Sequence, residues 1–298
     1  MISAAMHCDT RETTRTALAP AKINLTLEVH GCRADGFHAL TSLVAGVELF
    51  DEMTVTPAGR PGIHLVCDAP TVPVDEGNLV TQAAALLSQR LASPPGVRIE
   101  LRKRIPVGAG LGGGSSDCAA ALRVLNALWA TGLPEAELAE LGARLGSDVP
   151  LFFHLPTAVV TGRGDRVRRT PLGWSGWVVL AFGGWAVSTR EVYANWREED
   201  RVGRDYNVID AVLSRTTASR RGPLLLNELE PAVYRTAPAV LDFHQALVGS
   251  TGHPWRISGA GSTAFVLFDR EADARRMGEA VITNELAKRV AVIRNLST

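Results

Sequence analysis

The chain has 298 residues, of which 46% are hydrophobic and 21% are charged, so it is long enough to bury one large core or two ordinary ones. Lysine plus arginine number 31, as do aspartate plus glutamate. The resulting net charge of zero excludes bulk attraction to nucleic acid or to an anionic membrane. Any phosphate must therefore be bound by a few placed residues.

The four cysteines, Cys8, Cys32, Cys67 and Cys118, are widely spaced and form no CxxC pair. This spacing predicts neither a zinc ribbon nor a disulfide framework, and it is typical of the reducing cytoplasm. Residues 1–18 lack the apolar segment of a secretory signal and carry two acidic residues, which disfavour a transit peptide. We expect a loose start to the chain and no membrane-spanning segment, because no apolar run reaches roughly 18 residues.

The N-terminal half opens with a predicted strand over residues 21–29, where five apolar residues alternate with four polar ones. This is the period of a strand with one buried face. The patterns that follow predict strands over 40–50, 52–57 and 62–67, a helix over 78–91, a strand over 96–101, helices over 117–130 and 134–145, and strands over 157–161 and 166–170.

A cluster of proline, glycine and serine at residues 171–176 predicts a domain boundary. Beyond it the sequence predicts a strand over 177–182, helices over 189–196 and 206–214, a longer helix within 228–247, a strand over 262–268, a helix over 271–288 and a strand over 290–293. The arginine-rich residues 197–222 are expected to be a solvated loop flanking a short helix. The irregular order of strands and helices indicates an α+β fold.

The most distinctive motif runs from Pro106 to Ser116 and reads PVGAGLGGGSS. Glycines let the backbone turn its N–H groups onto an anion, and the following helix offers a free N-terminus that favours phosphate. No Gly-Lys-Ser/Thr follows, so this is not a Walker loop. We predict a phosphate-binding loop rather than a plain glycine turn. The residues concerned are Pro106, Gly108, Gly110, Gly112, Gly113, Gly114, Ser115 and Ser116.

Two other residues have the chemistry of a kinase that acts on an alcohol. Such an enzyme needs a base for the hydroxyl proton and a cation near the transferred phosphoryl group. Asp148 and Lys22 fit these roles, but taken alone a helix N-cap explains Asp148 equally well, and a solvated strand face explains Lys22 better. The small glycine loop at residues 258–262 and the turn residue His38 are weak signals by themselves.

Together these motifs resemble the superfamily of galactokinase, homoserine kinase, mevalonate kinase and phosphomevalonate kinase (GHMP kinases). The resemblance lies in residues 20–25 (PAKINL), 106–116 and 258–262 (SGAGS). Residues 33–38 (RADGFH) and 145–150 (LGSDVP) are similar to the family whose members phosphorylate 4-diphosphocytidyl-2-C-methyl-D-erythritol. The resemblance covers roughly residues 19–295.

The resemblance implies a two-domain α+β fold with the active site in a cleft. Residues 19–172 would form a mixed α/β domain for ATP binding and catalysis, and residues 173–298 a ferredoxin-like α/β domain for substrate binding. It also implies ATP and Mg²⁺ as cofactors and a small-molecule acceptor, cytidine diphosphate methylerythritol, of the non-mevalonate isoprenoid pathway. The expected enzyme is a cytoplasmic monomer or weak homodimer with no nucleic-acid or membrane partner.

The same resemblance implies roles for individual residues of the active site. Asp148 matches the catalytic aspartate, and Lys22 matches the lysine that polarises it and the substrate hydroxyl. Besides the glycine loop, Asn78 and Lys103 match positions lining the adenosine pocket. The matches for the acceptor site are Asn24, Phe37, His38, Thr189 and Tyr193.

Two positions depart from the family pattern, because Phe37 stands where tyrosine is usual and Tyr193 where phenylalanine is familiar. A phenylalanine keeps base stacking and loses the hydrogen bond of the hydroxyl. Three alternatives stay open from sequence. The chain is another GHMP kinase, which would not need residues 33–38; or it is an inactive relative, which would have lost Lys22 or Asp148; or Phe37 is a core residue of the first hairpin.

Overall fold

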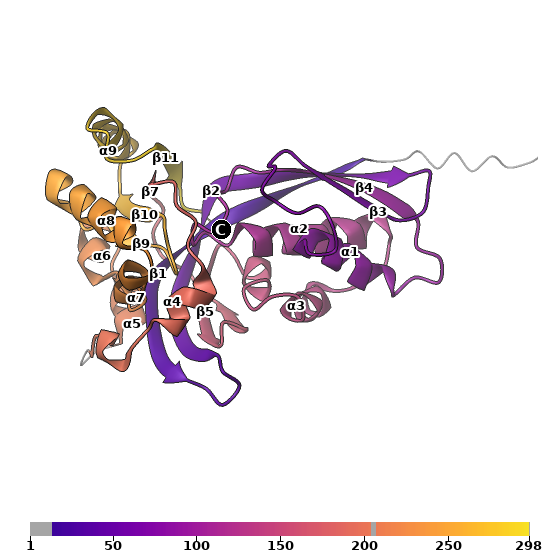
Figure 1. The fold of residues 1–298 in the computed structure, drawn as a ribbon, viewed down its shortest axis with the longest axis horizontal. Coiled ribbons are helices and arrows are strands. Elements are labelled where there is room, and N and C mark those ends of the chain that lie inside the picture. Colours follow the sequence, from indigo (N-terminus) through magenta and orange to yellow (C-terminus); the bar gives the residue numbers. More distant parts are fainter. Residues whose placement is uncertain (1–13, 204–206, 298) are drawn as a thin grey trace, which may run out of the picture.

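The computed structural model describes residues 14–203 and 207–297. Its larger sheet has seven strands, with β3-β4-β2-β1-β8 hydrogen-bonded in that order and β5 bridging β2 and β6 (Figure 1). The strands are β1 (Arg15–Cys32), β2 (His38–Ala58), β3 (Ile63–Cys67), β4 (Gly96–Arg102), β5 (Thr157–Gly162), β6 (Arg166–Arg169) and β8 (Leu226–Asn227). The loose start expected for residues 1–18 is wrong for residues 15–18, which belong to β1; residues 1–13 lie outside the described part.

The strand β2 is continuous, whereas the sequence predicted two strands with a break at Asp51. Asp51 does not lie in a turn. It is fully buried, accepts a hydrogen bond from the backbone N–H of Ile105 at 2.9 Å and forms an ion pair with Lys103. The sequence around Asp51 does not show the partners from another segment that stabilise its buried carboxylate. An aspartate without such partners would interrupt a strand, which is why the prediction failed.

Three helices lie on one side of this sheet (Figure 1). They are α1 (Leu79–Ser88), α2 (Gly113–Leu128) and α3 (Glu135–Ala143). Helices α1 and α2 pack against strands of the sheet, and α3 packs against α2. The helix predicted over 117–130 begins four residues earlier, because the end of the glycine motif already has helical geometry. Asn78 and Pro134 stand outside α1 and α3 as their N-caps.

The smaller sheet has four antiparallel strands in the order β11-β7-β10-β9. Its strands are β7 (Trp177–Phe182), β9 (Arg256–Ile257), β10 (Ala264–Phe268) and β11 (Arg289–Arg294), and its longer helices are α7 (Glu230–Thr236), α8 (Pro238–Thr251) and α9 (Glu271–Thr283). In chain order the strands run 4-1-3-2, with α7 and α8 between the first two and α9 between the last two. The expected ferredoxin-like α/β arrangement is confirmed.

The helix predicted within residues 228–247 is two helices. The chain breaks at Ala237, which has φ −140° and ψ 81°, and α8 begins at Pro238. Proline clashes with a helical residue before it, so the preceding residue leaves the α region. The apolar periodicity continues across the break, which is why the pattern suggested one helix.

The shorter helices of this half are α4 (Thr189–Ala194), α5 (Val208–Leu213) and α6 (Ala218–Arg221). Tyr206, where a helix was predicted to start, lies outside the described residues. The expectation that residues 197–222 are fully solvated is wrong at Arg221, which is completely buried and donates from Nη2 to the carbonyl of Leu172 at 2.8 Å. The arginine-rich composition suggested solvent exposure, so the buried, hydrogen-bonded Arg221 could not be recognised from sequence.

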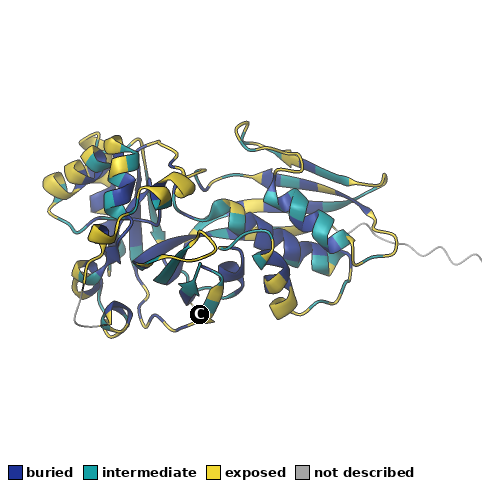
Figure 2. Ribbon diagram, turned by 60° about the horizontal axis from the view of Figure 1, so that its bottom comes forward, coloured by how far each residue is buried: buried dark blue, intermediate teal, exposed yellow. Residues whose placement is uncertain are grey.

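The two halves share a hydrophobic core. Ile23 and Leu25 from β1 belong to the same buried cluster as Leu180 and Phe265 from the smaller sheet. The strand β8, from the second half, pairs in parallel with β1. Exposed residues gather on loops and on the outer turns of helices (Figure 2). Among the described helices, none has the length and apolar character to cross a bilayer.

Candidate active site

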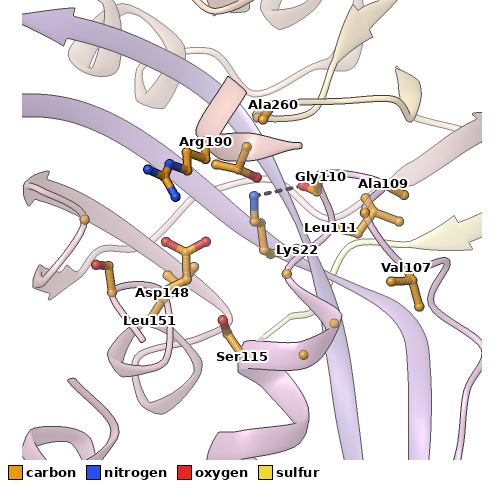
Figure 3. Close-up of a pocket in the computed structure, with 18 of the residues that line it drawn as sticks. Lys22, Val107, Ala109, Gly110, Leu111, Ser115, Asp148, Leu151, Arg190 and Ala260 are labelled. Carbon is orange, nitrogen blue, oxygen red and sulfur yellow. Dashed lines mark hydrogen bonds between the residues drawn. The ribbon is translucent and has the colours of Figure 1, made fainter. Parts of the chain in front are cut away.

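A cavity of about 1020 Å³ lies where β1, the glycine loop, α4 and the turn between β1 and β2 meet. Every residue singled out from the sequence for the site lines this cavity except Ser116. Ser115 and Ser116 are adjacent in the first turn of α2, so they point about 100° apart. The hydroxyl of Ser115 faces the cavity (Figure 3). Ser116 is buried away from it, with no described hydrogen-bond partner, and its predicted phosphate contact is corrected accordingly.

Lys22 is the cation at the centre of this cavity. It is 5% exposed, so the interpretation as a solvated strand residue is wrong. Its Nζ donates to Oδ1 of Asn24 at 2.7 Å and to the carbonyl of Gly110 at 2.9 Å. Asn24 in turn donates to the hydroxyl of Ser42 at 2.8 Å. Burial lowers the pKa of Lys22, and the negative charge of Asp148 opposes this effect.

Asp148 lies in the loop after α3 and is exposed to the cavity. The short 3₁₀ helix Pro150–Phe153 begins beyond Val149 and has no side-chain cap, so the N-cap interpretation of Asp148 is wrong. Its carboxylate points towards Lys22 and Arg190 (Figure 3). The charge of Asp148 also contributes, after burial, to raising the pKa of Tyr193. Asp148 has no hydrogen-bond or ion-pair partner among residues 14–203 and 207–297, and a carboxylate of this kind near a buried ammonium is the arrangement that proton abstraction needs.

The glycine loop is folded tightly against a second loop from the other half of the chain. Gly110 has φ +76°, and a Cβ there would lie 2.0 Å from the carbonyl oxygen of Ser258. The hydroxyl of Ser258 donates to the carbonyl of Gly110 at 3.0 Å. The 258–262 motif therefore supports the glycine loop, which sequence alone did not establish. Gly114, by contrast, has open space where a Cβ would lie.

The opposite end of the cavity is aromatic. Phe37 lies in the turn between β1 and β2 and is 49% exposed, so it is not a core residue. The guanidinium of Arg163 lies 5.2 Å from its ring centroid. The ring of His38 lies 5.3 Å from that of Tyr193 and 5.4 Å from that of Trp196. Burial lowers the pKa of His38, which favours a neutral imidazole able to both donate and accept a hydrogen bond.

Asn78 and Lys103 line the cavity, but their polar groups already have protein partners. Asn78 accepts from the N–H of Val80 at 2.8 Å as the cap of α1 and donates to the carbonyl of Pro73. They therefore shape the wall expected to hold adenosine more than they offer free hydrogen-bonding groups to it.

Lys103 lies between two buried carboxylates. Its Nζ pairs with Asp117 at 2.5 Å and with Asp51. Burial alone would lower the pKa of Lys103, but the negative charges of Asp117 and Asp51 have the larger combined effect and raise this pKa. Burial also raises the pKa of Asp117 to about 7, although the charge of Lys103 opposes the rise.

Four charged residues in or beside the cavity were not predicted. Asp51 and Asp117 hold Lys103, while Arg163 and Arg190 line the cavity. Asp117 directly follows the two serines of the glycine motif, a position that could have drawn attention to it. Arg190 follows Thr189 at the start of α4 and had no signal, because nothing local distinguishes it from a solvated arginine.

The chain matches two family models, "GHMP kinases N terminal domain" over residues 78–154 and "GHMP kinases C terminal" over residues 210–288. It is 39% identical over 263 residues to 4-diphosphocytidyl-2-C-methyl-D-erythritol kinase of Geobacter sp. (strain M21), covering 87% of this chain and 91% of that protein. It is 38% identical over 280 residues to the protein of the same name from Brevibacillus brevis, covering 93% and 95%.

The chain is also similar to solved structures of the same group of proteins. A crystal structure of 4-(cytidine 5'-diphospho)-2C-methyl-D-erythritol kinase superposes with a TM-score of 0.81 at 35% identity, covering 95% of this chain and 100% of that one. Homoserine kinase from Cytophaga hutchinsonii superposes with a TM-score of 0.74 at 18% identity, covering 98% and 97%. The second similarity shows the fold alone.

Proposed function

The chain belongs to the GHMP kinases and, within them, to the 4-diphosphocytidyl-2-C-methyl-D-erythritol kinases, and we propose that it transfers the γ-phosphate of ATP to the 2-hydroxyl of 4-diphosphocytidyl-2-C-methyl-D-erythritol. The observation that carries this proposal is that Lys22, Asp148, the glycine loop and the aromatic residues Phe37, His38 and Tyr193 all line one cavity.

Asp148 is proposed to take the proton of the acceptor hydroxyl while its oxygen attacks the γ-phosphorus. The new O–P bond forms as the bond from the γ-phosphorus to the bridging oxygen breaks, and ADP leaves with that electron pair. Lys22 supplies positive charge beside the hydroxyl and the transferred phosphoryl group. Its hydrogen bonds to Asn24 and Gly110 fix the ammonium in place, which reduces the rearrangement needed during the reaction.

The triphosphate is proposed to lie against the N-terminus of α2. Gly112 caps this 16-residue helix without a side chain, so its first N–H groups are free for an anion. Ser115 adds a hydroxyl from the first turn. Neutral overall charge is no obstacle, because the loop supplies local donors.

Mg²⁺ is proposed to accompany ATP. In the described residues no group of three histidine, cysteine, aspartate or glutamate side chains is placed to hold a metal. Mg²⁺ in kinases commonly takes one or two protein oxygens and otherwise phosphates and water, and Ser115 and Asp148 present such oxygens to the cavity. When bound, the ion would neutralise charge on the phosphates. The cytoplasmic location and the monomeric or weakly dimeric state stay predictions.

A substrate comparison tests the proposal. Purified protein is incubated with ATP and Mg²⁺ together with 4-diphosphocytidyl-2-C-methyl-D-erythritol, mevalonate or homoserine, and ADP release is measured. Rapid turnover of the cytidylated substrate alone is expected, because Phe37, His38 and Tyr193 offer a pyrimidine site. Preferred turnover of mevalonate or homoserine would overturn it.

A further inference from the structure

Arg190 lines the cavity and is exposed to it. In Figure 3 its guanidinium lies on the same side of Lys22 as the carboxylate of Asp148, and the labelled residues Val107, Ala109 and Gly110 of the glycine loop lie on the other side of Lys22. Arg190 is three residues before Tyr193 in α4, so the two side chains lie on neighbouring parts of one helix surface. The guanidinium is therefore placed between the proposed reacting centre and the proposed pyrimidine pocket.

The other cations of the cavity are already engaged. Among the described residues that line it, Lys103 and Arg163 are held in ion pairs with aspartates, and Lys22 donates two hydrogen bonds. For Arg190, in the same part of the chain, no hydrogen bond or ion pair is formed. An arginine facing a cavity without a partner has its five N–H donors available to a ligand.

We infer that Arg190 binds the diphosphate bridge of the acceptor substrate. This inference rests on the proposed function. In a cytidine diphosphate ester, two ionised phosphates separate the base from the alcohol that is phosphorylated. If the base lies against Phe37 and Tyr193 and the alcohol lies at Asp148, the bridge passes beside Arg190. A planar guanidinium matches phosphate oxygens in a paired, charge-assisted geometry.

The position of Arg190 is set by the start of its helix. The hydroxyl of Ser188 accepts a hydrogen bond from the N–H of Glu191 at 3.3 Å and caps α4. Val192, two residues further on, is fully buried and holds the helix against the smaller sheet. The backbone of Arg190 is thus fixed while its side chain remains exposed. Replacing the side chain should leave the fold intact.

The test compares R190M with the unchanged enzyme. Methionine keeps the apolar stem and removes the charge. We expect KM for the cytidylated acceptor to rise roughly tenfold to a hundredfold, with KM for ATP unchanged and the melting temperature unaffected. R190K should recover part of the loss, because it restores charge without the planar fork. R220M is the matched control, since Arg220 is exposed on α6 and does not line the cavity.

Calorimetry with cytidine and CDP isolates the phosphate contribution. The unchanged enzyme should bind CDP more tightly than cytidine, and R190M should lose most of this preference while binding cytidine as before. An undiminished preference in R190M, or a rise in KM for ATP in place of the acceptor, overturns the inference. If the proposed function is wrong, the result is different: the enzyme without any substitution does not turn over the cytidylated substrate.

Discussion

The ammonium of Lys22 donates a hydrogen bond of 2.9 Å to the carbonyl of Gly110, in the middle of the glycine loop (Figure 3). The cation proposed to assist phosphoryl transfer is therefore tied to the loop proposed to hold the triphosphate. A shift of the loop would displace the ammonium as well. We therefore expect binding of ATP and alignment of the proposed catalytic pair to be coupled through this contact.

Replacing the proposed base should slow chemistry without affecting folding. In D148N the side chain keeps its size but accepts no proton, so we expect kcat to fall by roughly 10²–10⁴. The melting temperature should hardly change, because Asp148 is exposed and caps no helix. D242N, an exposed aspartate of α8, is the control. Near-normal turnover in D148N would remove Asp148 from the mechanism.

The glycine loop can be tested where a side chain has room. Gly114 has open space at its Cβ position and lies in the first turn of α2. In G114V the fold should persist, but the side chain would occupy the space of the phosphates, so we expect ATP affinity to fall at least tenfold by calorimetry. G249V is the matched control, because Gly249 is also helical and open. Unchanged ATP affinity in G114V would place the triphosphate elsewhere.

A substitution at Phe37 should affect binding of the acceptor and leave binding of ATP unchanged. In F37A we expect KM for the cytidylated substrate to rise roughly tenfold to a hundredfold, because base stacking on an aromatic ring is worth about 1–3 kcal/mol. KM for ATP and the melting temperature should stay unchanged, since the ring is half exposed. F37Y should be tolerated. L18A, which truncates another exposed apolar side chain, provides the control, and a parallel loss of ATP affinity in F37A would refute the pocket assignment.

Asp117 should make stability depend on pH. Burial raises its pKa from the ordinary value of 3.8 to about 7 in the folded protein. Between these values the folded protein holds a proton that the unfolded chain releases, so the contribution of Asp117 to the free energy of unfolding falls as pH rises. Denaturant unfolding from pH 4 to 7 should show a smaller decline in D117N than in the unchanged protein. An equal decline in both would contradict the assignment, and D242N should behave as the unchanged protein.

The parts of the fold that follow from local pattern were predicted well. The strand over 177–182 matches β7 at both ends, and the alternation in residues 21–29 identified the centre of β1. Errors arose where distant residues decide the outcome. Asp51 is compatible with a strand only because Lys103 and two backbone N–H groups meet it there.

The same distinction holds for the site. The glycine motif could be recognised from sequence because few structures other than a phosphate-binding loop require its composition. Lys22 and Asp148 had ordinary explanations until the fold brought them together, and the resemblance to a family was what selected them. Arg190 had neither a motif nor a match, because its significance lies in the cavity it faces and in the absence of a described partner.

The support that Ser258 gives to Gly110 has a consequence for how the protein is made. The two residues are 148 positions apart in sequence, so during synthesis the glycine loop leaves the ribosome long before its support exists. The loop cannot adopt its final shape until nearly the whole chain has emerged. A nascent chain that ends before residue 258 should therefore gain no protection from ATP, whatever secondary structure its first half has acquired.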